Sequence, residues 1–152
     1  MRYYFLYQTE AGRLWICEED GNITYVAYRD VSSGYEKKET PLIKRMYEQL
    51  IEYFSGRRTV FDIPINASGT TFQKQVWSAL SSIPYGATRT YKQIAELIGN
   101  PKGCRAVGLA NNRNPISIVV PCHRVVGTNG KLVGYAGGLH VKEKLLLLEK
   151  RK

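Results

Sequence analysis

An apolar run that stops at two reactive side chains constrains the fold of this chain more than any other stretch. Residues 116–126 read I-S-I-V-V-P-C-H-R-V-V. The β-branched residues before Pro121 predict a short buried strand, and Pro121 ends it because proline cannot donate to a sheet ladder. Cys122 and His123 therefore lie where the backbone leaves the core, at a rigid position that is still reachable from outside.

The Cys122–His123 pair has two interpretations. A free thiol titrates near about pH 8.5, and a charged or hydrogen-bonding neighbour such as His123 or Arg124 brings the thiolate within reach of neutral pH. The pair is then a nucleophile with its base. A free cysteine is also often buried and inert, and the pair taken alone favours this second interpretation.

The content of cysteine and histidine argues against disulfides and metal. The cysteines Cys17, Cys104 and Cys122 are widely spaced and form no C-x-x-C, and the only histidines are His123 and His140. We therefore expect free thiols, no metal site and no cofactor. No apolar run approaches the roughly 20 residues of a membrane helix, and the N-terminus opens directly into a strand pattern. A cytoplasmic protein, or a nuclear one in a eukaryote, is expected.

The net charge of +9 is placed unevenly along the chain. Residues 1–69 hold nine Lys/Arg and ten Asp/Glu, whereas residues 70–152 hold thirteen and three. A scattered basic surface would only aid solubility. Basic charge gathered in the half that carries Cys122 instead indicates a polyanionic partner such as nucleic acid.

The first half of the chain predicts a sheet and one helix. Residues 3–8, 13–17 and 23–28 are rich in aromatic and β-branched side chains and are separated by Gly-containing turn signals, which predicts an antiparallel meander. Residues 31–39 are polar and predict a loop. Thr40 then caps a helix that ends near Gly56, and residues 60–65 form a further extended segment. Nothing in this half suggests catalysis, so its expected role is structural.

The second half predicts helices and a hairpin. Residues 66–69 read as a linker, so the expected domains are 1–68 and 69–152. In the second domain we expect a first helix from Thr70 to Pro84, with Gln73 in a capping box, and a second helix from Tyr91 to Ile98. A third helix, capped by Asn100, runs from Pro101 to about Asn112. A hairpin over 125–133, closed at Asn129-Gly130, and a helix from Val141 to Lys150 follow. The second and third helices have a helix-turn-helix layout, with the hairpin as a wing.

The third helix has features that suit a recognition helix. It carries Arg105 and Arg113 without an acidic residue between Pro101 and Asn114. Ala106 and Gly108 are small enough to let its backbone approach another surface. Each helical glycine costs roughly 1 kcal/mol relative to alanine, so its presence needs a reason. Packing within the protein and a close approach to DNA both remain open.

Several motifs in one order make residues 70–150 resemble the O6-alkylguanine-DNA alkyltransferase family. The motifs are T-Y-K-Q-I-A from Thr90, G-N-P from Gly99, R-A-V-G from Arg105, P-C-H-R-V from Pro121 and G-Y-x-G-G from Gly134. The resemblance implies a ribonuclease H-like first lobe, a winged helix-turn-helix second lobe, and a fold of the α+β or α/β class. It further implies DNA repair by irreversible, stoichiometric transfer of the alkyl group from O6-alkylguanine to Cys122, and leaves O4-alkylthymine open as a second substrate.

The chemistry of this transfer agrees with the residues around the motif. Displacement at an sp³ carbon needs a soft anionic nucleophile, Cys122, and a base for its proton, His123, acting through a bridging water. Glu149 would hold the imidazole in place. Taken alone, the sequence favours a solvated charge at a helix end for Glu149, and the resemblance implies the triad-like role.

The resemblance also assigns roles to the remaining site residues. Tyr91 helps to rotate the base and donates a proton toward purine N3, Arg105 fills the gap in the base stack, and Asn114 braces the cysteine loop. The pocket would be formed by Pro121, Val125, Tyr135, Ala136 and Gly137. Further DNA contacts would come from Ala106, Gly108, Arg113 and Arg124. Ala136 departs from the family, since many relatives have serine or another polar residue there.

Three other functions compete with this interpretation. A non-catalytic alkyltransferase-like protein would lack Cys122 and usually the first lobe. A winged-helix regulator would explain the charge and helices but not P-C-H-R. A cysteine hydrolase would leave the basic half unexplained. The expected partner is double-stranded DNA carrying the lesion, with no membrane, no obligatory protein partner, and the protein acting as a monomer.

Overall fold

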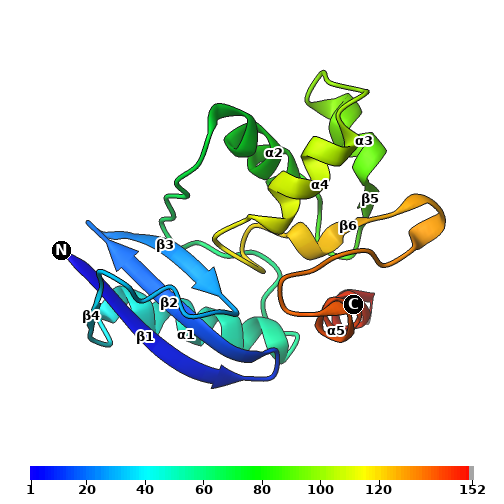
Figure 1. Cartoon of the computed structure of the whole chain (residues 1–152). Coiled ribbons are helices and arrows are strands. Elements are labelled where there is room, and N and C mark those ends of the chain that lie inside the picture. Colours follow the sequence, from blue (N-terminus) through cyan, green and yellow to red (C-terminus); the bar gives the residue numbers. More distant parts are fainter. Residues whose placement is uncertain (151–152) are drawn as a thin grey trace. The chain divides into compact units, whose positions relative to one another are not determined.

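The chain forms two compact units, Met1–Ser68 and Gly69–Lys152, in a computed structural model that describes residues 1–150 (Figure 1). Each unit is described by itself below. No helix within residues 1–150 is both long and apolar enough to cross a bilayer.

Unit 1 is built on a four-stranded sheet in the order β3-β2-β1-β4. The strands are β1 (Arg2–Thr9), β2 (Gly12–Glu19), β3 (Asn22–Ala27) and β4 (Glu36–Lys37). The first three are antiparallel neighbours, as the turn signals predict, and Asp20 and Gly21 in the tight β2–β3 turn both have positive φ. The loop prediction for residues 31–39 was wrong in part, because β4 pairs parallel with β1. A two-residue strand leaves no periodic signal in a sequence.

Helix α1 (Pro41–Phe54) lies along one face of this sheet (Figure 1). Thr40 caps it as predicted, since its hydroxyl accepts a hydrogen bond from the Ile43 amide at 3.1 Å. Gly56 follows the helix with a φ of 79°. The helix packs on the sheet through its apolar stripe, including a stacked pair of rings, Tyr7 and Tyr47, whose centroids are 3.9 Å apart.

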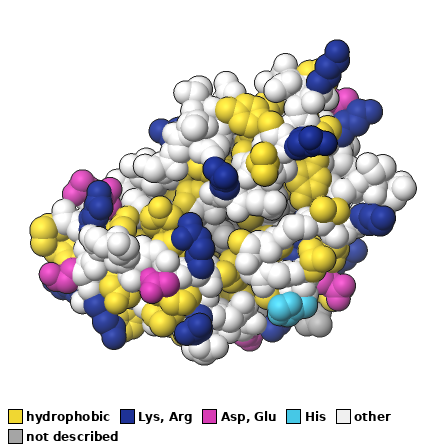
Figure 2. All heavy atoms as spheres, in the orientation of Figure 1, with side chains coloured by type: hydrophobic (Ala, Val, Ile, Leu, Met, Phe, Trp, Pro, Cys, Tyr) yellow, Lys and Arg dark blue, Asp and Glu magenta, His cyan; other side chains and the backbone are white. Residues whose placement is uncertain are grey.

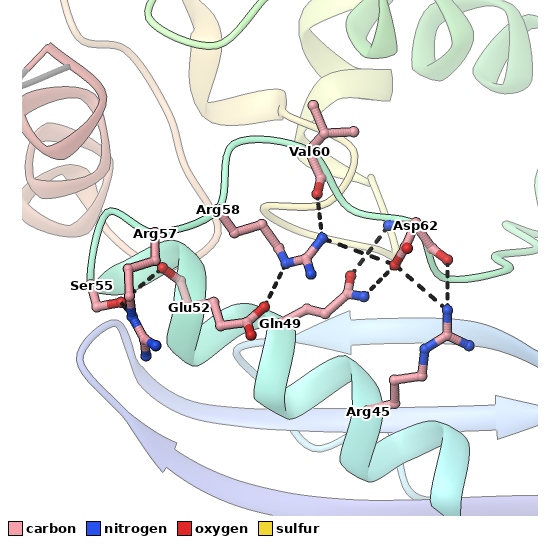
Figure 3. A network of polar contacts seen from close by, with 8 residues as sticks. All are labelled: Arg45, Gln49, Glu52, Ser55, Arg57, Arg58, Val60 and Asp62. Atoms are coloured by element: carbon pink, nitrogen blue, oxygen red, sulfur yellow. Dashed lines mark hydrogen bonds and ion pairs between the residues drawn. The ribbon is translucent and has the colours of Figure 1, made fainter.

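A polar network fastens the segment after α1 back onto the helix (Figure 3). Gln49 is bonded to both the backbone amide and the carboxylate of Asp62. Arg45 donates to the Asp62 carbonyl at 3.1 Å, and Arg58 donates to Glu52 at 2.7 Å. These bonds hold the extended residues 60–65, whose last residue bridges to Ile23 of β3. The network supports the fold of unit 1.

Unit 2 is mainly helical. Its elements are α2 (Thr71–Ser81), β5 (Arg89–Thr90), α3 (Tyr91–Leu97), α4 (Cys104–Asn112), β6 (Val125–Val126) and α5 (Leu139–Lys150). The capping box expected at Thr70 and Gln73 is present, and Thr90 and Gln93 form a second one at α3. Trp77 of α2 donates its indole N–H to the Ala110 carbonyl at 2.9 Å, which fixes α4 against α2.

The predicted start of the third helix and the predicted hairpin in unit 2 were wrong. Helix α4 begins at Cys104 rather than Pro101, because residues 100–103 form a turn in which the Gly103 amide donates to the Asn100 carbonyl at 2.9 Å. The hairpin over 125–133 is absent, since β6 pairs in parallel with β5 and Thr128–Gly130 form a 3₁₀ turn. Asn129 does adopt positive φ there, so the turn signal was correct, but the strand before the turn pairs with β5 and no strand follows the turn within the described residues.

Candidate active site

The segment before Cys122 is a compact turn and not the predicted strand. The Val120 amide donates to the Ile116 carbonyl at 3.0 Å, and the Val119 amide donates to the Ser117 carbonyl at 2.8 Å. Ile118 has a φ of 73°, a conformation that a β-branched residue rarely adopts. The prediction failed because a short apolar run identifies a buried segment without fixing its backbone; Ile116, Ile118 and Val120 are indeed buried.

Asn114 holds this turn together from within. Its side-chain amide donates to the Val120 carbonyl at 2.8 Å and to the Ile116 carbonyl at 3.3 Å, while its oxygen accepts from the Ile116 amide at 3.0 Å. Those bonds replace the sheet partners that the segment lacks. Asn114 thus has the bracing geometry that the family resemblance implies.

Cys122 follows this turn and starts a 3₁₀ turn, Cys122–Arg124, that leads into β6. The thiol is 3% exposed. Asn111 of α4 donates its side-chain amide to the Cys122 carbonyl at 3.3 Å. The cysteine is therefore held from both sides, by the Asn114 turn and by α4.

His123, Arg124 and Glu149 form a buried cluster, called the Glu149 cluster below. The Nε2 atom of His123 is 2.7 Å from one carboxylate oxygen of Glu149. Arg124 donates to both oxygens of the same carboxylate, from Nε at 2.8 Å and from Nη2 at 3.0 Å. Glu149 is 2% exposed, so it is not the solvated charge that the sequence alone favoured.

Arg124 is not placed to contact DNA. It is 7% exposed, and its third nitrogen donates to the Ile83 carbonyl at 2.8 Å. The expectation of a DNA contact from Arg124 is thus corrected. Basic character gave no information about whether the side chain points into the fold, and here its guanidinium is committed to a buried carboxylate.

Burial dominates the electrostatics of the reactive pair. It raises the pKa of Cys122, and a side-chain hydrogen bond with Asn114 and the charge of Lys142 oppose that rise. The pKa of His123 is lowered, chiefly by burial. The bond to Glu149 opposes this shift, while the positive charges of Arg124 and Lys142 add to it. In the resting site these directions favour a protonated thiol beside a neutral imidazole.

Lys142 of α5 faces the same site and has no anionic partner among its hydrogen bonds. Its ammonium donates to the Val133 carbonyl at 3.0 Å and to the Gly134 carbonyl at 3.3 Å. Burial lowers its pKa to about 8, although the Cys122 thiolate acts in the opposite direction. The sequence analysis missed this residue, because a single lysine in a helix is ordinarily solvated.

Tyr91 lies at the start of α3 and is half-buried. Its hydroxyl donates to the Val133 carbonyl at 2.9 Å, so the 133–134 backbone is bonded by both Tyr91 and Lys142. Burial raises the pKa of Tyr91, and the negative charge of a Cys122 thiolate adds to the rise. The phenol consequently remains a proton donor at neutral pH.

The expected pocket residues do not share one environment. Pro121 and Val125 are buried next to the reactive turn, Tyr135 and Gly137 are half-buried, and Ala136 is exposed. The Gly138 amide donates to the Tyr135 carbonyl at 3.0 Å, which closes a turn. Gly138 has a φ of 97°, a conformation that favours glycine.

Helix α4 presents most of its predicted DNA-contacting residues to solvent. Arg105, Ala106 and Arg113 are exposed. A Cβ atom added at Gly108 would meet the Tyr91 ring at an ordinary distance of 3.9 Å, so packing within unit 2 does not require the glycine.

Surface charge and metal-ligand content complete the description of the site. Figure 2 shows Lys and Arg side chains spread singly among apolar ones over the face drawn. Within residues 1–150, His, Cys, Asp and Glu form no group of three or more that could hold a metal ion. All three cysteines are free thiols.

Comparisons with known proteins decide the family. Residues 2–67 match the ribonuclease-like domain of 6-O-methylguanine DNA methyltransferase, and residues 71–151 match its DNA-binding domain. The chain is 48% identical to the methylated-DNA–protein-cysteine methyltransferase of Methanosarcina acetivorans, with 97% of each chain covered. It is 45% identical to the constitutive enzyme of Bacillus subtilis, covering 99% of this chain and 96% of that one.

The chain belongs to the methylated-DNA–protein-cysteine methyltransferase family. Its structure is also similar to that of a Mycobacterium tuberculosis OGT solved in complex with DNA, with a TM-score of 0.91, 42% identity, and 98% and 93% of the two chains covered. The predicted α+β fold class and the family prediction are confirmed. The protein is a DNA-binding methyltransferase of direct-reversal repair, and the competing functions are not favoured.

Within this family of methyltransferases, the sequence analysis missed two residues near Cys122. Lys142 belongs to the V-K-E stretch at the start of the last helix, and Asn111 belongs to the N-N-R-N stretch that ends α4. The signal for Asn111 was a polar residue at the helical spacing of the buried Val107 and Ala110. The signal for Lys142 was its place in the V-K-E stretch, which the family resemblance covers, but its burial depends on contacts with residues 133–134 that the sequence does not reveal.

Proposed function

We propose that this methyltransferase repairs O6-alkylguanine in double-stranded DNA by transferring the alkyl group irreversibly to Cys122. The observation that carries the proposal is the placement of a buried thiol between the Asn114-braced turn and the hydrogen-bonded Glu149 cluster. A soft nucleophile with a neighbouring base suits displacement at an alkyl carbon. The protein would act as a monomer, without a cofactor, wherever the cell keeps its DNA.

The reaction begins with the proton of Cys122. A water relays it from the sulfur to the neutral His123, and Glu149 stabilises the imidazolium that forms. The thiolate attacks the alkyl carbon as the bond from that carbon to O6 breaks, and the bonding electrons pass to the purine. Burial raises the free energy of the thiolate, whose charge is localised on sulfur. In the transition state that charge is dispersed toward the purine, so reaching it costs little further free energy.

The leaving purine takes its proton from Tyr91. The raised pKa of the phenol keeps it protonated and able to donate toward N3. The imidazolium proton then returns through water to the tyrosinate. One proton has moved from sulfur to guanine, and the alkyl group has moved from oxygen to sulfur. A thioether has no ready route back to a thiol, so each molecule reacts once.

The alkylated guanine must leave the base stack, because its alkyl carbon is otherwise out of reach of the Cys122 thiol. The exposed Arg105 on α4 would fill the space that the extruded nucleotide leaves. Ala106 and Gly108 would let α4 lie close to the groove, and Arg113 would bind a phosphate. The pocket for the base would lie between residues 121–125 and 135–137.

The test is a stoichiometric transfer assay with a radiolabelled methyl group in a duplex. One equivalent of label should move to the wild-type protein, and mass spectrometry should find it on the peptide that contains Cys122. Cys122→Ala should transfer none and still bind the duplex, because basic side chains carry the affinity. Cys104→Ala is the matched control and should transfer one equivalent.

Two results would overturn the proposal. Turnover beyond one equivalent would exclude an irreversible acceptor. Label on Cys17 or Cys104 would assign a different nucleophile, although burial raises the pKa of Cys17 to about 12 and leaves that thiol unreactive.

A further inference from the structure

All three guanidinium nitrogens of Arg124 are hydrogen-bonded. It donates to both Glu149 oxygens and to the Ile83 carbonyl. The Tyr85 ring lies beneath it, with the guanidinium carbon 5.6 Å from the ring centroid. Arg124 thereby joins three parts of unit 2: the residues after α2, the reactive turn, and the end of α5.

This arrangement restricts what Glu149 can do for His123. A carboxylate that faced an imidazole alone in a buried site would favour the imidazolium strongly. Here the two Glu149 oxygens already accept hydrogen bonds from a permanent cation, which neutralises the charge of the carboxylate. The oxygen 2.7 Å from His123 still fixes the ring orientation.

Lys142 acts on His123 in the same direction as Arg124, because its positive charge also disfavours the imidazolium. The charged and titratable groups are Arg124 and Cys122 from the reactive turn, Glu149 and Lys142 from α5, and Tyr85 from the segment after α2. A protonated His123 would place a third positive charge beside Arg124 and Lys142, opposed by one carboxylate. A neutral His123 leaves the Arg124–Glu149 pair balanced.

We propose that Arg124 is a positioning residue for alkyl transfer, which holds Glu149 against His123 and keeps the imidazole uncharged until Cys122 gives up its proton. The proposal rests on the proposed function, because it concerns the base of that reaction. Nε2–H of the neutral ring is donated to Glu149, which leaves Nδ1 to receive the proton from sulfur. The sulfur retains the electron pair of the broken S–H bond.

Removal of Arg124 should therefore make His123 a cation at neutral pH. In Arg124→Met the Glu149 carboxylate loses the cation that binds both of its oxygens and keeps its bond to His123, so the imidazolium is stabilised. A neighbouring opposite charge shifts a pKa by about one to three units. We therefore expect the titration midpoint of His123 to rise by that amount when the Glu149 charge is no longer neutralised by Arg124. A base that already carries a proton cannot accept another, so the acidic limb of the rate profile should move to higher pH with it.

Histidine ring NMR on the full chain without DNA measures this directly, since the only other histidine, His140, serves as an internal reference. In the wild type we expect a neutral His123 with the proton on Nε2 at pH 7. In Arg124→Met its titration midpoint should rise by about one to three pH units. In Arg124→Met/Glu149→Gln it should fall again, because both charges are gone. Lys74→Met, which removes an exposed charge from α2, should leave His123 unchanged.

The rate measurement uses a methylated duplex at saturating concentration across pH 5.5 to 9. The acidic limb of Arg124→Met should follow the raised midpoint of His123, while that of Lys74→Met should match the wild type. A merely structural role for Arg124 would lower the rate equally at every pH, and that result would overturn the proposal.

The NMR result is decisive even if Arg124→Met does not fold. An imidazolium at position 123 in the wild type at pH 7 would overturn the proposal, and so would a folded Arg124→Met with an unchanged midpoint. Neither result depends on methyl transfer. Failure of the proposed function would instead appear as absent transfer by the wild type, with the His123 titration as expected.

Discussion

Two buried cations lie close to Cys122, and the fold stabilises them in different ways. Arg124 has a carboxylate partner and remains charged in the folded protein. Lys142 donates to the carbonyls of Val133 and Gly134, and burial lowers its pKa to about 8. Hydrogen bonds to carbonyl oxygens alone offset only part of the free-energy cost of removing an ammonium group from water. Lys142 therefore favours the Cys122 thiolate electrostatically at a cost in stability.

That cost should depend on pH in a defined window. The folded pKa of Lys142 lies below its ordinary value of 10.5, so between about pH 8 and 10.5 the unfolded chain binds the extra proton and stability rises with pH. Over this window the wild type should gain up to about 3 kcal/mol relative to Lys142→Met. Urea unfolding at pH 7.5 and 10 measures the difference, in which titrating groups that do not interact with Lys142 cancel.

Lys144→Met is the control for this prediction. It removes an exposed lysine from the same helix, and its difference from the wild type should stay nearly constant between the two pH values. A Lys142→Met difference that is equally constant would show that Lys142 is hydrated in the folded protein.

Single residues show why the site was only partly predictable. Cys122, His123 and Asn114 belong to local motifs, so their places could be expected before the structure was known. Glu149 and Arg124 have partners 25 positions apart in the chain, and their burial depends on how α5 packs. A sequence gives their charges but not their partners. The DNA contact expected of Arg124 failed for this reason.

Among the helices and strands, sequence signals predicted the structure reliably where a side chain needs only one hydrogen-bond partner nearby in the chain. Thr40, Thr70 and Thr90 cap the helices that follow them, since a side-chain oxygen needs only an amide three residues ahead. Elements that depend on distant partners were predicted poorly. Val125–Val126 pair with Arg89–Thr90 rather than with residues 132–133, and nothing near the Asn129 turn indicates that choice.

Helix α4 supports a prediction that separates extrusion of the base from chemistry. Arg105→Ala should slow methyl transfer from a duplex by about tenfold, because a loss of about 1.4 kcal/mol of support for the extruded state corresponds to that factor. Reaction with free O6-benzylguanine, which needs no extrusion, should keep its rate. Rapid-quench kinetics at saturating duplex, alongside rates with the free base, supply both numbers.

Arg113→Ala is the matched control at the other end of α4, since it removes the same exposed charge. It should weaken duplex binding and leave the rate at saturation nearly unchanged. Equal losses with duplex and free base in Arg105→Ala would show that Arg105 acts on the pocket and not on the DNA.

The molecule as a whole separates two tasks between its units. Residues 1–69 carry nearly balanced charge and residues 70–152 carry the excess of Lys and Arg. The reactive turn, the Glu149 cluster and α4 all belong to unit 2. In unit 1, α1 packs on the sheet and the Asp62 network binds the following segment to that helix (Figure 3). We infer that unit 1 has a structural role.

The last prediction concerns the stability of the molecule after it has reacted. Cys122 is 3% exposed, and its backbone and neighbours are held by Asn111 and Asn114. A methyl group on the sulfur adds volume where packing is dense, and overpacking of this kind costs about 1–3 kcal/mol. A benzyl group is larger and should cost more. For a chain of this size about 1 kcal/mol lowers the melting temperature by roughly 2–4 °C. We therefore expect melting temperatures to fall in the order unmodified, methylated, benzylated in thermal melts of the three forms in one buffer.

Cys122→Ala treated with O6-benzylguanine controls for effects of the reagent, and its melting temperature should not shift. Equal or higher midpoints for the alkylated forms would mean that the site accepts the product without strain and that the Asn114-braced turn is not disturbed by it.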